Sequence, residues 1–507
     1  MSAPEVDPGF LRLPLRALGD AALARAEALG VIHADFRFER VRYQRLAVRD
    51  EVLQSAQDHE DLGFAVRVVH GGAWGFASGV ILTADEARRV AETAVAVARV
   101  AADMTRVPVL LAPEPVYADV TWCSSYERDP WAVPTPEKAT VLVDWTRRLR
   151  AHPTVEHATA DLQQVHENKY YADLAGSRVT QQRVRLQPLF TAMGTDSASG
   201  VFDSMTSLAP PVGRGWEYLT GGDGAWDWDA ELAEVPELLA EKLRAPSVGA
   251  GSYDLVIDPS NLWLTIHESI GHATELDRAL GYEANYAGTS FATYDQLGTL
   301  RYGSPVMHVT GDRTVPHGLA TVGYDDEGVA TQSWDIVRDG VLVGYQLDRS
   351  MGAMMPELNG GRSNGCAYAD SPGHIPIQRM ANVSLQPGPG TTTEDLISRV
   401  DRGLYIVGDK SWSIDMQRFN FQFTGQRFYR IERGRLAGQV RDVAYQATTT
   451  DFWGALEAVG GPETWVLGGA FNCGKAQPGQ VAAVSHGCPS ALFRDVRILN
   501  TTEEAGH

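Results

Sequence analysis

The stretch NLWLTIHESIGHATELD, residues 261–277, places His267, Glu268 and His272 within six residues of one another. It follows a short strand-like run, YDLVIDP, and its apolar spacing is that of a helix. In a regular α-helix, side chains five residues apart point about 140° away from each other, so two such imidazoles cannot readily bind one ion. A π-bulge has a wider turn and would return both to one face. The spacing therefore predicts a local helix defect at this site.

The same stretch suggests a metal site. Gly271 immediately precedes the second histidine, where we expect glycine to supply the backbone freedom that the defect requires. If His267 and His272 bind a metal, zinc is the natural candidate, because neutral imidazoles suit it and a catalytic site needs only three protein ligands. Glu268 would then act as general base on the attacking water. The alternative is an ordinary helix that carries two partly buried histidines.

Spacing alone does not identify a third ligand. Glu275 lies about 80° round the helix from His267, and it is a candidate ligand or a partner that orients one. For any single cysteine, an inert buried side chain is the commoner role. The remaining candidates are His486 and the four cysteines, Cys123, Cys366, Cys473 and Cys488.

The small residues APSVGAGS (245–252) precede this strand and helix, and we place a domain boundary there. Strand-like runs with turn signals dominate the part that follows, including an Asp339-Gly340 turn and the alternating aromatics Phe419, Phe421 and Phe423. These aromatics indicate one face of a buried strand or, alternatively, a peptide groove. The part before the boundary mixes predicted helices over 14–30, 83–103, 136–151 and 229–244 with strands over 35–49 and on both sides of a turn at Gly71-Gly72.

The bulk composition excludes several classes of protein. At 507 residues the chain is too long for one ordinary core. Its net charge of −20 disfavours partners with phosphate backbones or anionic lipid, so we expect neither nucleic acid nor membrane binding. The N-terminal residues lack the apolar core of a signal peptide, and four scattered cysteines do not make a disulfide framework. A reducing cytoplasm is the expected location.

Five further blocks accompany the histidine stretch HESIGHATELD (267–277). They are GFAVRV (63–68), GRGWEYL (213–219), YDDEG (324–328), GRSNGCAYADSPGHIPIQRMANVSLQPG (361–388) and NCGKAQPGQ (472–480). In their sequence and order, these blocks resemble the TldD/PmbA metallopeptidase family over nearly the whole chain. The most specific is HESIGHATELD, which is similar to the family's His-Glu-x-x-x-His motif with a trailing glutamate and aspartate, here Glu275 and Asp277.

The resemblance implies a zinc site held by His267, His272 and Cys473, with Glu268 as the catalytic base. It implies an α+β fold: a mixed α/β N-terminal domain, residues 1–247, and a β-rich, curled C-terminal domain, residues 248–507, that carries the metal-binding helix. Glu275 and Asp277 are expected to support the ligands. His374 and Arg379 lie in a family-like block, for which substrate contact and a structural role are equal alternatives.

The expected function is that of a zinc-dependent endopeptidase that cleaves short or unfolded polypeptides, which it grips by strand addition. The expected partner is a PmbA-like paralogous subunit or a second copy of the chain. Two alternatives remain: a catalytically idle metal- or peptide-binding subunit, and a zinc hydrolase that acts on a small amide.

One block departs from the family pattern. Where a Gly-rich segment is usual after the Cys-Gly-Lys motif, this chain reads VSHGCPS, which places His486 and Cys488 close in sequence to Cys473. We expect both residues to line a loop. The alternatives are that Cys488 joins the metal site or forms a disulfide with Cys473.

Overall fold

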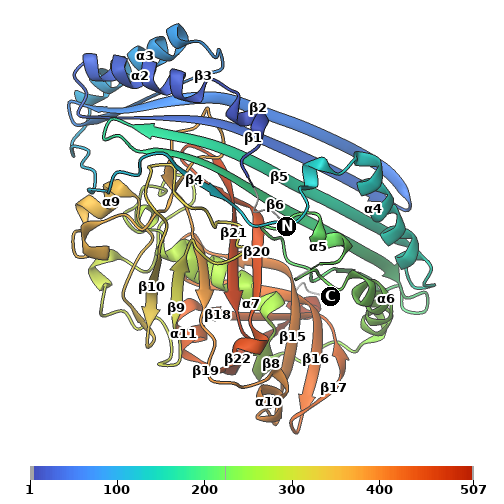
Figure 1. Cartoon of the computed structure of the whole chain (residues 1–507). Helices are drawn as coiled ribbons and strands as arrows, with labels where there is room; N and C mark the ends of the chain where they lie inside the picture. The colour runs from blue at the N-terminus through green and yellow to red at the C-terminus, as the bar shows by residue number, and fades with distance from the viewer. Residues whose placement is uncertain (1–4, 223, 505–507) are drawn as a thin grey trace.

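The first half of the chain builds a long, curved sheet (Figure 1). The structure is a computed structural model that describes residues 5–222 and 224–504. Within these residues the strand order is β3-β2-β1-β5-β6-β4, and β7 pairs with β6. The strands are β1 (His33–Arg49), β2 (Val52–His70), β3 (Ala73–Gly79), β4 (Val120–Cys123), β5 (His157–Asp173), β6 (Arg178–Thr195) and β7 (Phe202–Thr206).

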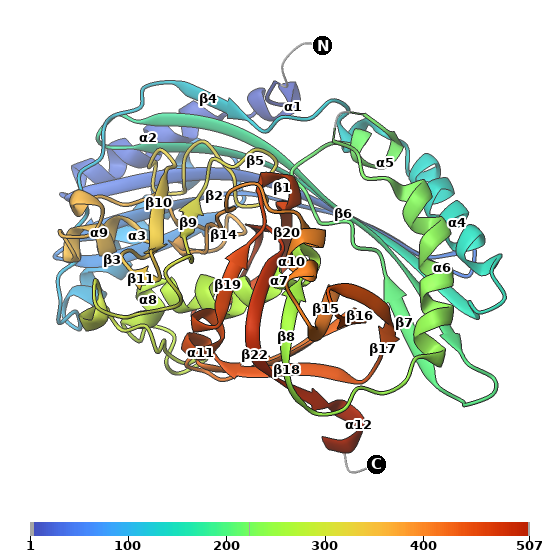
Figure 2. The same cartoon turned by 90° about the horizontal axis from the view of Figure 1, so that it is seen from below.

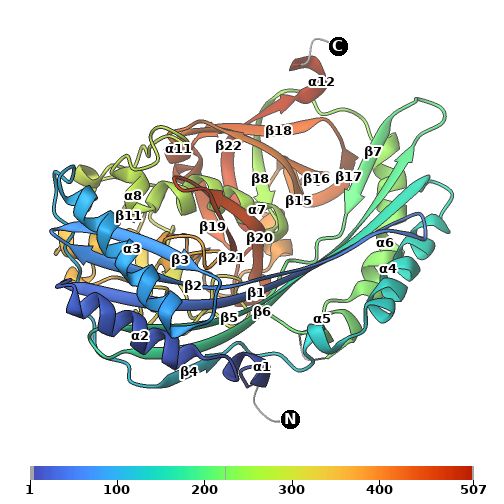
Figure 3. The ribbon, with the colours of Figure 1, turned by 90° about the horizontal axis from the view of Figure 1, so that it is seen from above.

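One face of this sheet is apolar and is covered by helices. Side chains alternate along a strand, so Phe36 and Phe38 of β1 enter the same core as Phe64 of β2. Two helices cover this end of the sheet and two more cover the other end (Figure 3). They are α2 (Leu15–Ala28), α3 (Ala84–Ala102), α4 (Thr135–Arg150) and α6 (Trp228–Arg244), which confirms the four predicted helices.

The opposite face of the sheet is charged, yet it is buried against the second half of the chain. Arg67 donates to Asp35 of β1 and, at 2.8 Å, to Glu327 of the second half. Lys169 of β5 likewise donates to Asp326 at 2.6 Å. Because an unpaired buried charge is costly, these ion pairs require the two halves to pack together in one arrangement.

The second half is β-rich and includes a closed barrel, which confirms the predicted α+β fold class. Within the described residues, β15-β8-β22-β18-β16 follow one another, and a further β15–β16 pairing closes the ring (Figure 2). Phe421 and Phe423 stack in its core at 4.7 Å between ring centroids, as expected for the face of a buried strand. The barrel strands are β8 (Gly251–Ile257), β15 (Arg402–Ile414), β16 (Asn420–Glu432), β18 (Val443–Thr448) and β22 (Ala491–Asn500), with β17 (Arg435–Val440) and β19 (Leu456–Val459) attached.

Helix α7 (Pro259–Ile266) leads from β8 to the histidine motif and packs between the barrel and a separate hairpin, β20 (Val466–Lys475) and β21 (Gln480–Cys488). Asn261 binds backbone carbonyls of β15 and β16, and Thr265 lies 2.7 Å from the Tyr445 hydroxyl of β18. These bonds fix the rotation of α7 and therefore the direction of the side chains that follow it. Among the described residues, no helix is long and apolar enough to cross a membrane.

A small sheet packs against the hairpin through its strand β14 (Asn382–Leu385). β9 (Val309–Asp312), β10 (Ser333–Arg338), β11 (Val341–Leu342) and β14 form this sheet, in which the predicted Asp339-Gly340 turn joins β10 to β11. The proposed domain division at 247/248 falls between α6 and β8.

Candidate metal centre

The helix defect predicted from the histidine spacing is present. Residues His267–Gly271 form a π-helical turn directly after α7, and the His272 N–H donates to the His267 carbonyl five residues earlier. The two imidazole rings consequently lie 4.7 Å apart between centroids. The wider turn also displaces backbone carbonyls from regular helix bonding, and side chains bind them. Tyr302 donates to Ser269 O at 2.5 Å, and Gln346 donates to Gly271 O at 2.7 Å.

Gly271 is needed for a different reason from the one expected. Its φ of −51° and ψ of −61° are ordinary for a helix, so the position does not require the conformational freedom of glycine. A Cβ at this position would instead meet the Met380 sulfur at 2.6 Å and its methyl carbon at 3.0 Å. Met380 is buried, so glycine is there because a neighbouring side chain packs directly on the π turn.

We expect Gly271→Ala to lower the free energy of unfolding by about 1–3 kcal/mol, because the buried Met380 side chain must move to admit the new methyl group. Chemical denaturation measures this change. Gly454→Ala is the matched control, since Gly454 ends helix α11 (Thr449–Gly454) with nothing within 4 Å of the added Cβ. There we expect no loss of stability. Equal effects in the two variants would show that Met380 does not constrain Gly271.

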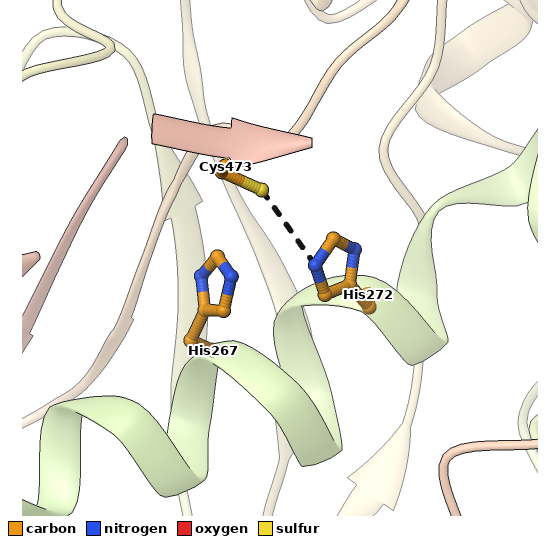
Figure 4. A group of neighbouring side chains, drawn as sticks. All are labelled: His267, His272 and Cys473. Atoms are coloured by element: carbon orange, nitrogen blue, oxygen red, sulfur yellow. Dashed lines mark hydrogen bonds between the residues drawn. The ribbon is translucent and has the colours of Figure 1, made fainter. Parts of the chain in front are cut away.

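Three donor side chains converge above the π turn. The nitrogen atoms of His267 and His272 and the Cys473 sulfur all lie within 4.8 Å of one another, and all three side chains are buried (Figure 4). Cys473 comes from β20, and its sulfur is 3.6 Å from His272 Nε2, across 201 residues of sequence. Burial raises the pKa of the Cys473 thiol to about 12 and holds the pKa of both imidazoles well below the usual value. Neutral imidazoles are ready ligands, and a bound cation would stabilise the thiolate.

Glu275 orients His272. The carboxylate Oε2 is 2.9 Å from His272 Nδ1, and because a carboxylate only accepts, Nδ1 carries the proton. The other ring nitrogen, Nε2, is left as an acceptor that points towards Cys473. This is the arrangement in which carboxylates hold metal-binding histidines.

Lys475 links the Glu275 carboxylate to β20, the strand that carries Cys473. This lysine was not singled out from the sequence. Its ammonium group donates to Glu275 at 3.0 Å, to Asp277 at 2.8 Å and to Gln378 at 2.7 Å, and it lies 3.7 Å from Glu283. The lysine side chain is fully buried. Its position two residues after Cys473 in NCGK was the available signal, because alternate residues of a strand share a face.

Glu268 faces an arginine that the sequence did not single out. Its carboxylate forms an ion pair with Arg418, which lies in the turn between β15 and β16 with a positive φ of 64°. Burial raises the pKa of Glu268, and the positive charge of Arg418 opposes that shift. Backbone N–H groups of residues 417, 419 and 420 donate to Asp415 and hold this turn in shape.

Arg379 and His374, for which substrate contact and a structural role were equal alternatives, both bind other parts of the chain. Arg379 is buried and donates to the backbone carbonyls of Cys473 at 2.6 Å and Gln480 at 3.1 Å, so it supports the β20–β21 hairpin. His374 pairs with Asp370 at 2.6 Å, and its side chain is 42% exposed.

The expectation that His486 and Cys488 line a loop is wrong, because both residues lie in strand β21. Cys488 is not among the side chains that converge at the metal centre, and the alternatives that placed it there are also wrong. In the hairpin register Cys473 pairs with Ala482, whereas Cys488 pairs with Val466. Cys488 is six positions beyond Ala482, which corresponds to about 20 Å along β21. All four cysteines are free thiols, and a Cys473–Cys488 disulfide is beyond reach.

A cavity of about 390 Å³ lies beside the centre, between β6 and β7 of the long sheet and the barrel. Trp263 of α7 forms part of its wall, one helical turn before His267. Val466 and Ala470 of β20 form another part, and within the described residues this strand pairs with β21 alone. The unpaired edge of β20 thus runs from the cavity towards Cys473.

Comparisons with known proteins agree with this architecture. A family model described as the PmbA/TldA metallopeptidase C-terminal domain matches residues 250–500, and one described as domain 1 of the same metallopeptidases matches residues 34–98. A protein of Methanothermobacter thermautotrophicus named metalloprotease is 26% identical over 93% of this chain and 96% of its own. A zinc metalloprotease TldD homolog of Saccharolobus solfataricus is 22% identical over 94% and 98%.

A solved structure shares the fold. The crystal structure of TldE from Thermococcus kodakarensis has a TM-score of 0.68 at 15% identity, and the match covers 95% of this chain and 99% of that one.

Proposed function

Since this chain belongs to the PmbA/TldD metallopeptidase family, we propose that it is a zinc-dependent endopeptidase that cleaves short or unfolded polypeptides. The observation that carries the proposal is the convergence of His267, His272 and Cys473 within 4.8 Å, with Glu268 next to the first of them. Two imidazoles and a thiolate are ligands that zinc takes in proteins. Their Nε2 and sulfur atoms would hold the ion.

When bound, zinc would polarise the scissile carbonyl and lower the pKa of water at the site. Glu268 accepts a proton as the water oxygen bonds to the carbonyl carbon. Glu268 then delivers that proton to the amide nitrogen as the C–N bond breaks, which leaves a carboxylic acid and an amine. Arg418 holds one carboxylate oxygen of Glu268, and the opposing effects of burial and this arginine on the Glu268 pKa suit a group that must both accept and release a proton.

The unpaired edge of β20 supports a peptide substrate over a small amide. An extended peptide placed along this edge would form backbone hydrogen bonds with β20, which select for extended shape rather than for sequence. One end of it would lie near Cys473, while residues further along would reach the cavity beside Trp263 and Val466. A folded protein would have to give up its own hydrogen bonds to bind in this way, so short or unfolded chains are the proposed class.

A PmbA-like paralogue or a second copy of the chain is the proposed partner, and the shared fold of TldE supports the first. The four free thiols are compatible with the expected cytoplasmic location, which stays a prediction.

We expect the purified chain to contain about one zinc and to cleave unstructured peptides, alone or after mixing with its closest paralogue that lacks the histidine motif. Chelation should abolish cleavage, and added zinc should restore it. A panel of small amides tested in parallel distinguishes a peptidase from an amide hydrolase. Bound zinc without cleavage under either condition would favour the idle subunit, and full activity after metal removal would contradict the proposal.

A further inference from the structure

His486, the residue at which this sequence departs from the family pattern, lies beside the metal centre without joining it. It comes from β21, is fully buried, and its Nε2 is 2.7 Å from Nδ1 of His267. Its other nitrogen, Nδ1, is 2.8 Å from the backbone carbonyl of Val383 in β14. The ring also lies parallel to Trp263, with an interplanar angle of 11°. It is therefore fixed from three sides.

These contacts determine which nitrogen of His486 and of His267 carries a proton. A carbonyl oxygen only accepts, so His486 Nδ1 carries a proton and donates it to Val383. In the neutral ring Nε2 is then an acceptor, and it receives the hydrogen bond of His267 Nδ1–H. His267 Nε2 is left unprotonated, as a metal ligand must be.

We infer that His486 is a positioning residue for the metal centre: it fixes His267 in the tautomer and orientation that present Nε2 beside His272 and Cys473. The inference rests on the proposed zinc site and deepens it. His486 does for His267 what Glu275 does for His272, but with a neutral acceptor in place of a carboxylate. The two metal-binding histidines thus differ in the charge of the group behind them.

The test compares two amide substitutions of His486 by their zinc affinity, measured by competition with a chromophoric chelator. In His486→Gln the longer amide brings an oxygen to the place of Nε2, so it can still accept from His267. In His486→Asn the shorter amide can bind Val383 but does not reach His267. We expect an affinity loss of about 10- to 100-fold for the asparagine variant, as for other residues that orient metal ligands, and only a few-fold loss for the glutamine variant.

Cys488→Ala is the matched control, because Cys488 lies two residues further along β21, is equally buried and does not reach the centre. We expect its zinc affinity to equal that of the unaltered chain.

X-ray absorption of the zinc-loaded forms should count two imidazoles and one sulfur in the unaltered chain and in both His486 variants. Circular dichroism of the metal-free proteins identifies any variant that fails to fold. If the asparagine variant does not fold, the glutamine variant decides alone. A 10- to 100-fold loss of zinc affinity in the glutamine variant would contradict the inference.

Different results would overturn the role of His486 and the proposed function on which that role rests. A chain that binds no zinc at all would overturn the proposed function. Zinc bound equally well by the asparagine variant and the unaltered chain would overturn the role of His486 and leave the peptidase intact. A third imidazole in the absorption spectrum, lost in both variants, would make His486 a ligand rather than a positioning residue.

Discussion

Glu268→Gln should abolish peptide cleavage while leaving zinc bound. The amide keeps the shape of the side chain but cannot accept a proton from water, and the loss of a general base lowers kcat by about 10²- to 10⁴-fold. His267, His272 and Cys473 are unchanged, so zinc content measured on the purified variant should stay at that of the unaltered chain. Steady-state kinetics with an unstructured peptide, together with metal analysis, provides the measurement.

Glu114→Gln is the matched control for this substitution. Glu114 is another buried glutamate paired with an arginine, Arg362 at 2.9 Å, and it lies outside the metal centre. The control removes another ion pair between a glutamate with a buried side chain and an arginine, although Arg362 is 42% exposed and Arg418 only 16%. It reports the effect on activity of losing such a pair away from the metal centre. If Glu268→Gln keeps activity similar to that of Glu114→Gln, then Glu268 is not the base.

The second large effect concerns Lys475. We expect Lys475→Met to lower the free energy of unfolding by about 3–5 kcal/mol, because it leaves Glu275, Asp277 and Glu283 buried together without their shared cation. Some of that cost would be relieved by protonation of a carboxylate, for burial already raises the pKa of Asp277 and Glu283. Chemical denaturation of the metal-free protein measures the change without the added contribution of zinc binding.

Lys410→Met serves as the comparison for Lys475→Met. Lys410 pairs with Asp203, but its side chain is 38% exposed, so solvent screens the interaction and we expect a loss of no more than about 1 kcal/mol. A similar small loss for Lys475→Met would mean that the buried carboxylates are neutral or find other partners.

Local sequence patterns predicted the elements whose cause is local. The four helices over residues 14–244 follow from apolar spacing at the helical period, and the Asp339-Gly340 turn follows from residue types that favour such turns. The strands β5 and β6 and the first part of β2 were missed. Residues 52–61 of β2 are polar and mostly exposed, so they lack the apolar alternation by which a strand is recognised.

The charged face of the long sheet was also beyond prediction. Charged side chains such as Arg67 and Lys169 are usually exposed to solvent. The carboxylates of Glu327 and Asp326, from the other half of the chain, make their burial possible. Which residues meet across that interface depends on the packing of the whole chain.

At the metal centre, the histidine spacing was enough to predict the π turn, because five-residue spacing of two ligands conflicts with the geometry of a regular helix. The side chains around that turn depend on how distant segments pack. That packing brought Cys473 to His272 across 201 residues, placed His486 behind His267 and excluded Cys488. The physical reason is that a helical turn is set by bonds between near neighbours, whereas the partners of a side chain are set by how distant strands pack and register.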